Sequence, residues 1–446
     1  MSEISDQTSS TPDLASLRSY WFFLSGQLAS LLGSSVVQFA IVWWITLTAK
    51  DDPALADNVG LILGIASFLG FAPMVVTFIF AGVFVDRWNR KVLIGAVDGL
   101  QALVSALLVY LFLIGEATIL YIFIVLFVRS VAQGFHRPAL DAIIPLLIPR
   151  EKLTKVNSVE YLANGLIFIV GPIVGAIVVE VVGLDNMGLI ISIDVFTFVM
   201  AIIPLVLITI PDITLSKRTS TEKTSFKHDF MEGIGFLKTN SGLLSLLVTF
   251  TICNFVLTPI FVLSPLIVYD YLKGGNAYIL ALSLAFFQFG ATVSSLILTQ
   301  KTLFTDNVKG VVYSQTIVYF CLFLLALSVI TGNIYLFLFV ALLRGICLPI
   351  MNVHSQNIWQ TVVPPELQGR VMSMRKIIAW GLNPVSMLLS GYLADAIGPT
   401  AIFLIGGFAG IFFLAYAWIE TDLSIVEEHL GLKESPLEPD KAPSST

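Results

Sequence analysis

Gly82-Val83-Phe84-Val85-Asp86-Arg87-Trp88-Asn89-Arg90-Lys91 is a short charged stretch between two long apolar runs, at about 59–85 and 92–114. Four of its ten residues are charged, whereas the runs on either side hold almost no charge. Both runs are long enough to cross a bilayer as helices. A membrane chain places charges where water or a partner charge receives them. The stretch therefore predicts a connection between two membrane-spanning helices.

Three residues of this stretch indicate local structure. Asp86 precedes Arg90 by four residues, so one more helical turn would place the two charges on one face as a pair. Gly82 permits another helix to approach closely. Asn89 is a residue type that tolerates a left-handed turn.

The composition places the whole chain in the membrane class. Hydrophobic residues make up 57% of it and charged residues 12%, and the mean hydropathy is +0.90. The basic residues are scattered over separate loops, which indicates no nucleic-acid partner. The three cysteines lie inside apolar runs without metal-ligand spacing, so neither a metal nor a cofactor is expected.

Apolar runs of spanning length predict an all-α membrane protein with twelve transmembrane helices, since the runs are longer than a barrel strand. The runs of the first half lie at about 20–47, 59–85, 92–114, 118–147, 160–183 and 188–210. Those of the second half lie at about 242–269, 276–300, 310–331, 333–361, 372–396 and 400–419.

The predicted chain has five parts. They are a cytoplasmic N-terminal tail at 1–19, a six-helix half at 20–210, a linker at 211–241, a second six-helix half at 242–420 and a disordered tail at 421–446. The positive-inside rule sets the orientation: the inner segments hold nineteen Lys and Arg residues, and the outer loops hold two. Both termini are expected in the cytoplasm.

The linker and the two halves carry further patterns. Apolar residues from Phe226 to Leu237 recur at helical spacing and predict an amphipathic helix on the inner membrane surface, with partner binding as the alternative. The halves repeat at an offset of 215 residues, which matches Arg129 with Arg344 and Pro149 with Pro364. Duplicated halves are typical of transporters with a central site. The second copy of the charged stretch, at about 299–309, has decayed.

The pattern G-x-x-x-D-R-x-N-R-K resembles the loop signature between the second and third helices of the major facilitator superfamily. That family usually has a second glycine where this chain has Asn89. Arg129 and Gly134 resemble its second signature, R-x-x-x-x-G. The resemblance implies that Asp141 meets the basic residues of the loop and latches the outward-open state. The implied gating residues are Gly82, Asp86, Arg87, Arg90, Lys91 and Asp141.

The fifth helix resembles the antiporter signature of drug-exporting members. The match consists of Gly165, Gly171, Pro172 and Gly175, whereas Ala176 replaces the last glycine. Gly171 and Gly175 alone would indicate close helix contact, which is common in any bundle.

Across about 18–420 the chain is similar to the macrolide-efflux branch of the superfamily. The stretches that carry this similarity are 94–98, 126–130, 135–140, 145–149 and 369–371.

Several polar side chains inside the spans are candidates for the mechanism. Arg129 and Arg344 are intramembrane charges, and the alternative for Arg129 is a salt bridge that only positions helices. Asp98 and Glu160 are candidates for proton coupling, because partial burial favours the protonated form of a carboxylate; the alternative for Asp98 is a structural cap. The candidates for the substrate cavity are Gln27, Gln38, Gln101, Gln133, Asn164, Asn254 and Gln288.

The sequence thus predicts a secondary active transporter that exports hydrophobic or amphiphilic molecules, such as macrolide-type antibiotics or other drugs, by proton antiport and alternating access. Its expected partners are a small-molecule substrate, protons and the lipid bilayer of the plasma membrane, where it would act as a monomer. The alternatives are an exporter of a siderophore or another metabolite, an importer or a lipid transporter. A membrane-embedded enzyme is disfavoured, because no P-loop or H-E-x-x-H motif occurs.

Overall fold

The computed structural model describes residues 14–208, 226–301 and 303–425, and every structural statement below concerns these residues. Six long helices form the first part of the chain. They are α1 (Leu14–Asp51), α2 (Val59–Arg87), α3 (Arg90–Leu113), α4 (Ile119–Leu147), α5 (Leu153–Val182) and α6 (Met187–Leu207). Short 3-10 helices at Ala56–Asn58, Arg150–Lys152 and Leu184–Asn186 lie in the connections. Of the predicted tails and linker, residues 1–13, 211–225 and 426–446 lie outside the described ranges.

Seven helices follow in the second part. They are α7 (Phe226–Thr239), α8 (Ser241–Leu266), α9 (Ala277–Gln300), α10 (Asn307–Thr331), α11 (Ile334–Val362), α12 (Gln368–Gly381) and α13 (Asn383–Glu420). A π-helical turn, Ile267–Tyr271, extends α8, and a 3-10 turn, Asp422–Ile425, follows α13.

Eleven apolar helical segments of the described chain are long enough to cross a membrane, and the last of them, Gln368–Glu420, has 53 residues. One span needs about 20 residues, so this segment holds two. Gly398 separates them: its φ of 79° and ψ of 157° break the helical geometry inside α13, and Pro399 begins the next helix. A positive φ is the conformation for which glycine is suited. The twelve spans predicted from the sequence are confirmed.

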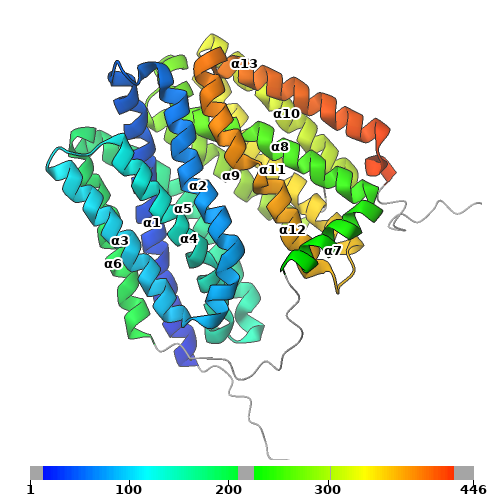
Figure 1. Cartoon of the computed structure of the whole chain (residues 1–446), viewed down its shortest axis with the longest axis horizontal. Helices are drawn as coiled ribbons and strands as arrows, with labels where there is room; N and C mark the ends of the chain where they lie inside the picture. Colours follow the sequence, from blue (N-terminus) through cyan, green and yellow to red (C-terminus); the bar gives the residue numbers. More distant parts are fainter. Residues whose placement is uncertain (1–13, 209–225, 302, 426–446) are drawn as a thin grey trace, which may run out of the picture. The chain divides into compact units, whose positions relative to one another are not determined.

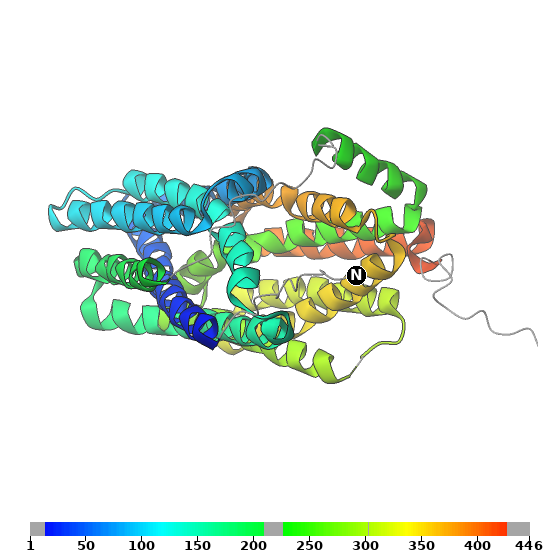
Figure 2. The same cartoon turned by 90° about the horizontal axis from the view of Figure 1, so that it is seen from below.

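The chain divides into two compact units, one of residues 1–219 and 275–285 and the other of residues 220–274 and 286–446. Within the first unit α1 contacts α5 and α6, while α4 contacts α2 and α3, and α3 also contacts α6. Figure 1 and Figure 2 both show α3 and α6 side by side. Within the second unit α8 contacts α13, and α10 contacts α11 and α13. The two units therefore repeat one pattern of helix contacts, as the sequence offset predicts.

Glycines allow some of these helices to approach closely. A Cβ atom on Gly171 would lie 2.1 Å from Ser35 Oγ, and one on Gly175 would lie 2.9 Å from Phe39 Cδ1. These two residues of the antiporter-like motif therefore form the contact of α5 with α1, and Gly165 and Pro172 are buried on the same helix. In the second unit a Cβ on Gly345 would lie 2.1 Å from the carbonyl oxygen of Phe287.

The amphipathic helix predicted in the linker is α7, of which the side chains from Met231 onward are described. Leu237 is buried, and Gly233 lies against Met374 of α12. Glu232 forms an ion pair with Arg370 of α12. This part of α7 therefore packs against α12 and α8 of its own unit.

The charged stretch that opens the sequence forms the break between α2 and α3. Asn89 has φ −63° and ψ 116°, so it does not take the left-handed conformation that asparagine tolerates. Its side-chain oxygen instead accepts a hydrogen bond from the backbone N–H of Val92, which makes it the N-cap of α3. An N-cap needs an extended backbone and an acceptor side chain, and asparagine provides both.

Candidate functional site

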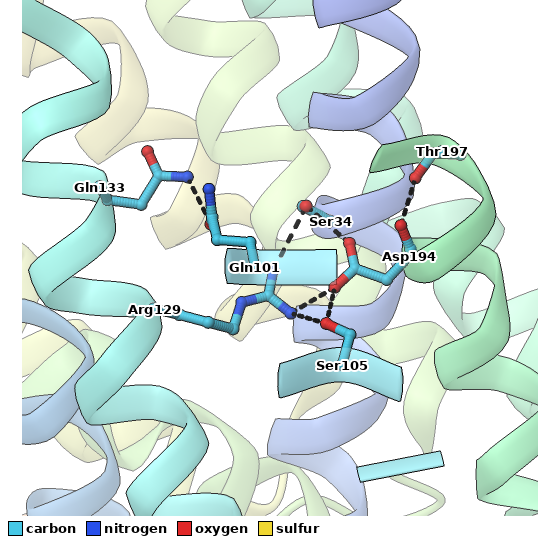
Figure 3. Close-up of polar contacts among 7 residues, drawn as sticks. All are labelled: Ser34, Gln101, Ser105, Arg129, Gln133, Asp194 and Thr197. Atoms are coloured by element: carbon cyan, nitrogen blue, oxygen red, sulfur yellow. Dashed lines mark hydrogen bonds and ion pairs between the residues drawn. The ribbon is translucent and has the colours of Figure 1, made fainter. Parts of the chain in front are cut away.

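A buried ion pair joins four helices of the first unit (Figure 3). Arg129 of α4 binds Asp194 of α6, whose side chain is fully buried. Ser34 Oγ of α1 donates to Asp194 Oδ1 at 2.7 Å, and Ser105 Oγ of α3 donates to Asp194 Oδ2 at 2.9 Å. The guanidinium also lies 5.7 Å from the centre of the Phe198 ring. We call Ser34, Ser105, Arg129 and Asp194 the Arg129 cluster.

The Arg129 cluster satisfies a charge that would otherwise be costly in the membrane. Arg129 Nη1 and Nη2 donate to Ser105 Oγ and Ser34 Oγ, each at 3.3 Å, in addition to the contact with Asp194. A buried ion pair gains from its attraction only when further hydrogen bonds complete it, and both serines do so here. The cluster can hold α1, α3, α4 and α6 together, which is the positioning role left open for Arg129.

A second buried carboxylate, Asp98 of α3, lies between two polar side chains. Gln27 Nε2 of α1 donates to Asp98 Oδ2 at 3.2 Å. His136 Nε2 of α4 lies 3.0 Å from Asp98 Oδ1, but the orientation of the imidazole ring does not allow a hydrogen bond between these two atoms. Asp98 is 1% exposed. The acid and the imidazole are therefore close neighbours without a completed hydrogen bond.

Two amides connect α3 and α4 between these groups. Gln133 Nε2 donates to Gln101 Oε1 at 3.1 Å, as Figure 3 shows. Asp98, Gln101 and Ser105 are all buried on α3, at the i, i+3 and i+7 spacing of one helical face. Three of the amides predicted for a substrate cavity, Gln27, Gln101 and Gln133, therefore have protein partners.

The other cavity candidates are dispersed. Gln38 is exposed on α1, and Asn164 is half-buried on α5. Asn254 Nδ2 donates to the carbonyl oxygen of Ala379 at 3.0 Å, and Gln288 Nε2 lies 3.5 Å from Thr292 Oγ1 on its own helix. Gln38 and Asn164 belong to the first unit, and Asn254 and Gln288 belong to the second. Neither pair forms a cluster among the described residues.

A third charged group lies where α4 meets α5. Arg137 Nε lies 3.2 Å from Asp141 Oδ1, and Arg137 Nη2 lies 3.4 Å from Glu160 Oε1. Arg90 Nη1 donates to the carbonyl oxygen of Ala142 at 2.9 Å. The structure thus places Arg90 beside the residue that follows Asp141, while the ion-pair partner of Asp141 is Arg137.

The remaining residues of the predicted gating motif are described in part. Lys91 Nζ donates to the carbonyl oxygens of Val206 at 3.0 Å and Ile208 at 2.6 Å, and so ties α3 to the end of α6. The side chains of Gly82, Asp86 and Arg87 lie outside the described ones.

Arg344 of α11 has a different environment from Arg129. It is 6% exposed, and its Nε and Nη1 atoms have no hydrogen-bond partner among the described residues. The rings of Phe261 and Phe287 lie 5.4 and 5.3 Å from its guanidinium carbon. Arg375 of the same unit, in contrast, donates to Gln356 Oε1 at 2.7 Å and to Ser355 Oγ at 2.9 Å. Among the described residues, Arg344 is therefore a buried cation without an acid as its partner.

The sequence did not assign three residues of these clusters: Asp194 as the partner of Arg129, His136 as the partner of Asp98, and Arg137 as the partner of Glu160. Asp194 is visible in the sequence as an intramembrane acid, and His136 follows Arg129 by seven residues on one helical stripe. Spacing along one helix does not show which face of another helix it meets, so these pairs needed the tertiary structure.

Comparison with known sequences places the chain in one family. The profile of the Major Facilitator Superfamily matches residues 23–382. Macrolide efflux protein A of Streptococcus pyogenes is 32% identical over 390 residues, which cover 87% of this chain and 92% of that protein. Macrolide efflux protein A of Enterococcus faecalis is 32% identical over 323 residues, covering 72% of this chain and 97% of that protein.

Solved structures share the fold at low sequence identity. A nucleoside transporter, NupG, has a TM-score of 0.63 at 12% identity, with 89% of this chain and 98% of that chain covered. A D-xylose-proton symporter has a TM-score of 0.63 at 11% identity, with 90% of this chain and 98% of that chain covered. At this level the likeness concerns the fold alone.

Proposed function

Because the chain belongs to the major facilitator superfamily, we propose that it exports hydrophobic or amphiphilic small molecules from the cell by proton antiport and alternating access. The family, the multi-pass membrane fold and the similarity to macrolide efflux proteins support a transporter. Macrolide-type antibiotics are the first substrates to test, since two of the similar proteins are named for their efflux. The excess of Lys and Arg in the inner segments supports cytoplasmic termini.

The observation that carries proton coupling is the contact of Asp98 with His136 and Gln27. A coupling group must gain a proton on one side of the membrane and lose it on the other. Asp98 is buried, accepts a hydrogen bond from the amide of Gln27 and lies 3.0 Å from the imidazole Nε2 of His136. Protonation of Asp98 removes its attraction for these groups, which belong to α1 and α4. Proton binding and helix contact are therefore coupled at this carboxylate.

The Arg129 cluster has a separate role in this proposal. Asp194 already has an arginine and two serine hydroxyls as partners. A buried ion pair completed by two hydroxyl donors is suited to holding helices together. The cluster thus positions α1, α3, α4 and α6, while Asp98 is the proposed coupling group. Glu160 remains the second candidate, with Arg137 as its cation.

The gating role of the charged stretch remains part of the proposal. Arg90 and Lys91 both donate to backbone carbonyls of neighbouring helices, at the ends of α4 and α6. Such hydrogen bonds can break and form as the protein changes conformation. The net free energy is small, because water can replace the protein donor at a carbonyl oxygen. Together with Gly82, Asp86, Arg87 and Asp141, these residues would form the latch that the family signature implies.

Asp98→Asn tests the coupling, because it mimics the protonated acid without changing its size. We expect uphill efflux of a radiolabelled macrolide, driven by an imposed pH gradient in proteoliposomes, to fall by at least about tenfold, while downhill exchange is retained. Asp185→Asn, which changes an exposed carboxylate, is the matched control. Normal uphill efflux in Asp98→Asn would exclude Asp98 and direct the search to Glu160. Loss of downhill exchange as well would make Asp98 a substrate or structural residue.

A further inference from the structure

The two units can be compared residue by residue by aligning the buried residues of corresponding helices. Besides the offset of 215 that relates α4 to α11, the buried residues of α3 match those of α10 at an offset of 214, which sets Gln101 against Gln315. The buried residues of α6 match those of the second part of α13 at an offset of 216, which sets Asp194 against Gly410.

These matches show what replaces the Arg129 cluster in the second unit. Tyr319 stands where the first unit has Ser105, and Gly410 stands where it has Asp194. The two meet in the same way: a Cβ atom on Gly410 would lie 2.4 Å from Cδ1 of the Tyr319 ring. The tyrosine ring thus takes the place of the serine hydroxyl and the carboxylate, and Arg344 has lost the acid that Arg129 keeps.

An amide has lost its partner in the same way. Gln315 is 0% exposed, and neither its Oε1 nor its Nε2 has a hydrogen-bond partner within the described part of the chain. Its counterpart Gln101 bonds to Gln133, but the residue that matches Gln133 in α11 is Leu348. Most buried polar groups in proteins have hydrogen-bond partners. The unpaired atoms of Gln315 on α10 and Arg344 on α11, two adjacent helices, therefore require an explanation.

We propose that Arg344 and Gln315 bind an acidic oxygen group, such as a carboxylate, on the transported molecule. A buried cation without an acid is stabilised most by an anion. The planar guanidinium matches a carboxylate with two parallel hydrogen bonds, and the amide Nε2 of Gln315 is one more donor. Phe261 and Phe287 offer apolar surface to the rest of such a molecule. This inference rests on the proposed transport function and specifies its substrate.

Phe261 provides access to this group. Its ring covers one side of the guanidinium and is itself 49% exposed. The Phe261 ring therefore lies between the guanidinium of Arg344 and the surface of the second unit. A change of the Phe261 rotamer would expose the cation without unfolding α8 or α11.

Binding of matched acid and ester probes to the purified full-length protein tests the proposal without requiring transport. The probes are rhodamine B, fluorescein and pyrenebutyric acid, each paired with its methyl ester, and the readout is fluorescence polarisation in detergent. We expect the acid of at least one pair to bind about tenfold more tightly than its ester, a difference of about 1.4 kcal/mol. Arg344→Gln should remove this preference and leave the affinity for the ester unchanged.

Two further variants separate binding from folding. Tyr319→Ser combined with Gly410→Asp places an acid at the position that matches Asp194 of the first unit, and should abolish the preference while Arg344 stays in place. Arg375→Gln is the control, since it removes a half-buried arginine that has its own partners, and it should keep the preference.

Two results would overturn the proposal. One is a wild-type protein that favours the acid in none of the three pairs. The other is an Arg344→Gln variant that weakens acid and ester equally, which would make Arg344 structural. Neither result bears on proton-driven export, which the Asp98→Asn experiment tests by transport.

Discussion

Arg129 and Arg344 occupy matching positions in two repeated units, yet their surroundings differ. Arg129 has an acid, two hydroxyls and one ring as neighbours, whereas Arg344 has two rings and unpaired N–H groups. In the first unit the Arg129 cluster satisfies its buried charges and thereby joins four helices. The second unit keeps the arginine and the glutamine but not their partners. The comparison teaches that a duplicated arginine can be a structural element in one copy and an available binding group in the other.

The largest expected difference concerns removal of each arginine. Arg129→Gln leaves the carboxylate of Asp194 buried without its cation, and should lower the free energy of unfolding by about 3–5 kcal/mol. Arg344→Gln removes a buried cation that has no acid, so we expect no loss of stability. Thermal unfolding of the two purified variants in one detergent measures the difference. Equal destabilisation would mean that Arg344 has a partner of similar strength, and the contrast between the units would fail.

A smaller effect is expected where Tyr319 replaces the acid. Gly410→Ala places a methyl group against the Tyr319 ring, and overfilling a core of this kind costs about 1–3 kcal/mol. Gly381→Ala is the control, because nothing lies within 4 Å of its Cβ position. Thermal unfolding in detergent again provides the measurement. If the stability of the Gly410→Ala variant is unchanged, the position of the Tyr319 ring does not require a glycine at residue 410.

The smallest effect concerns the amides. Leu348→Gln gives Gln315 the partner that Gln133 provides for Gln101, and should stabilise the protein by about 1 kcal/mol. The mirror variant, Gln133→Leu, should destabilise it by a similar amount. Denaturation midpoints of both variants measure the two changes. A destabilised Leu348→Gln variant would indicate that the glutamines of the two units do not correspond in space.

Local patterns in the sequence were sufficient for the fold. Hydropathy alone predicted the twelve spans, because a helix in a membrane satisfies its own backbone and needs only a long apolar run. The run that begins at about 400 was separated correctly from the one that ends at about 396, since Gly398 and Pro399 lie between them. The duplication could also be read from the sequence alone. Aligning the two halves at a fixed offset matches Arg129 with Arg344, and this requires no knowledge of which helices contact each other.

Only the tertiary structure decided which polar groups meet. Asp194 lies 65 residues from Arg129, and the two come together because α3, α4 and α6 contact one another. Two contacts are local instead: Asp141 pairs with Arg137 of its own helix, and Asn89 caps α3. A helical repeat fixes which residues share a face, but the rotation and order of neighbouring helices determine what that face contacts. Arg129 and Arg344 occupy matching positions, but the neighbouring helices bring Asp194 to Arg129 and Phe261 and Phe287 to Arg344.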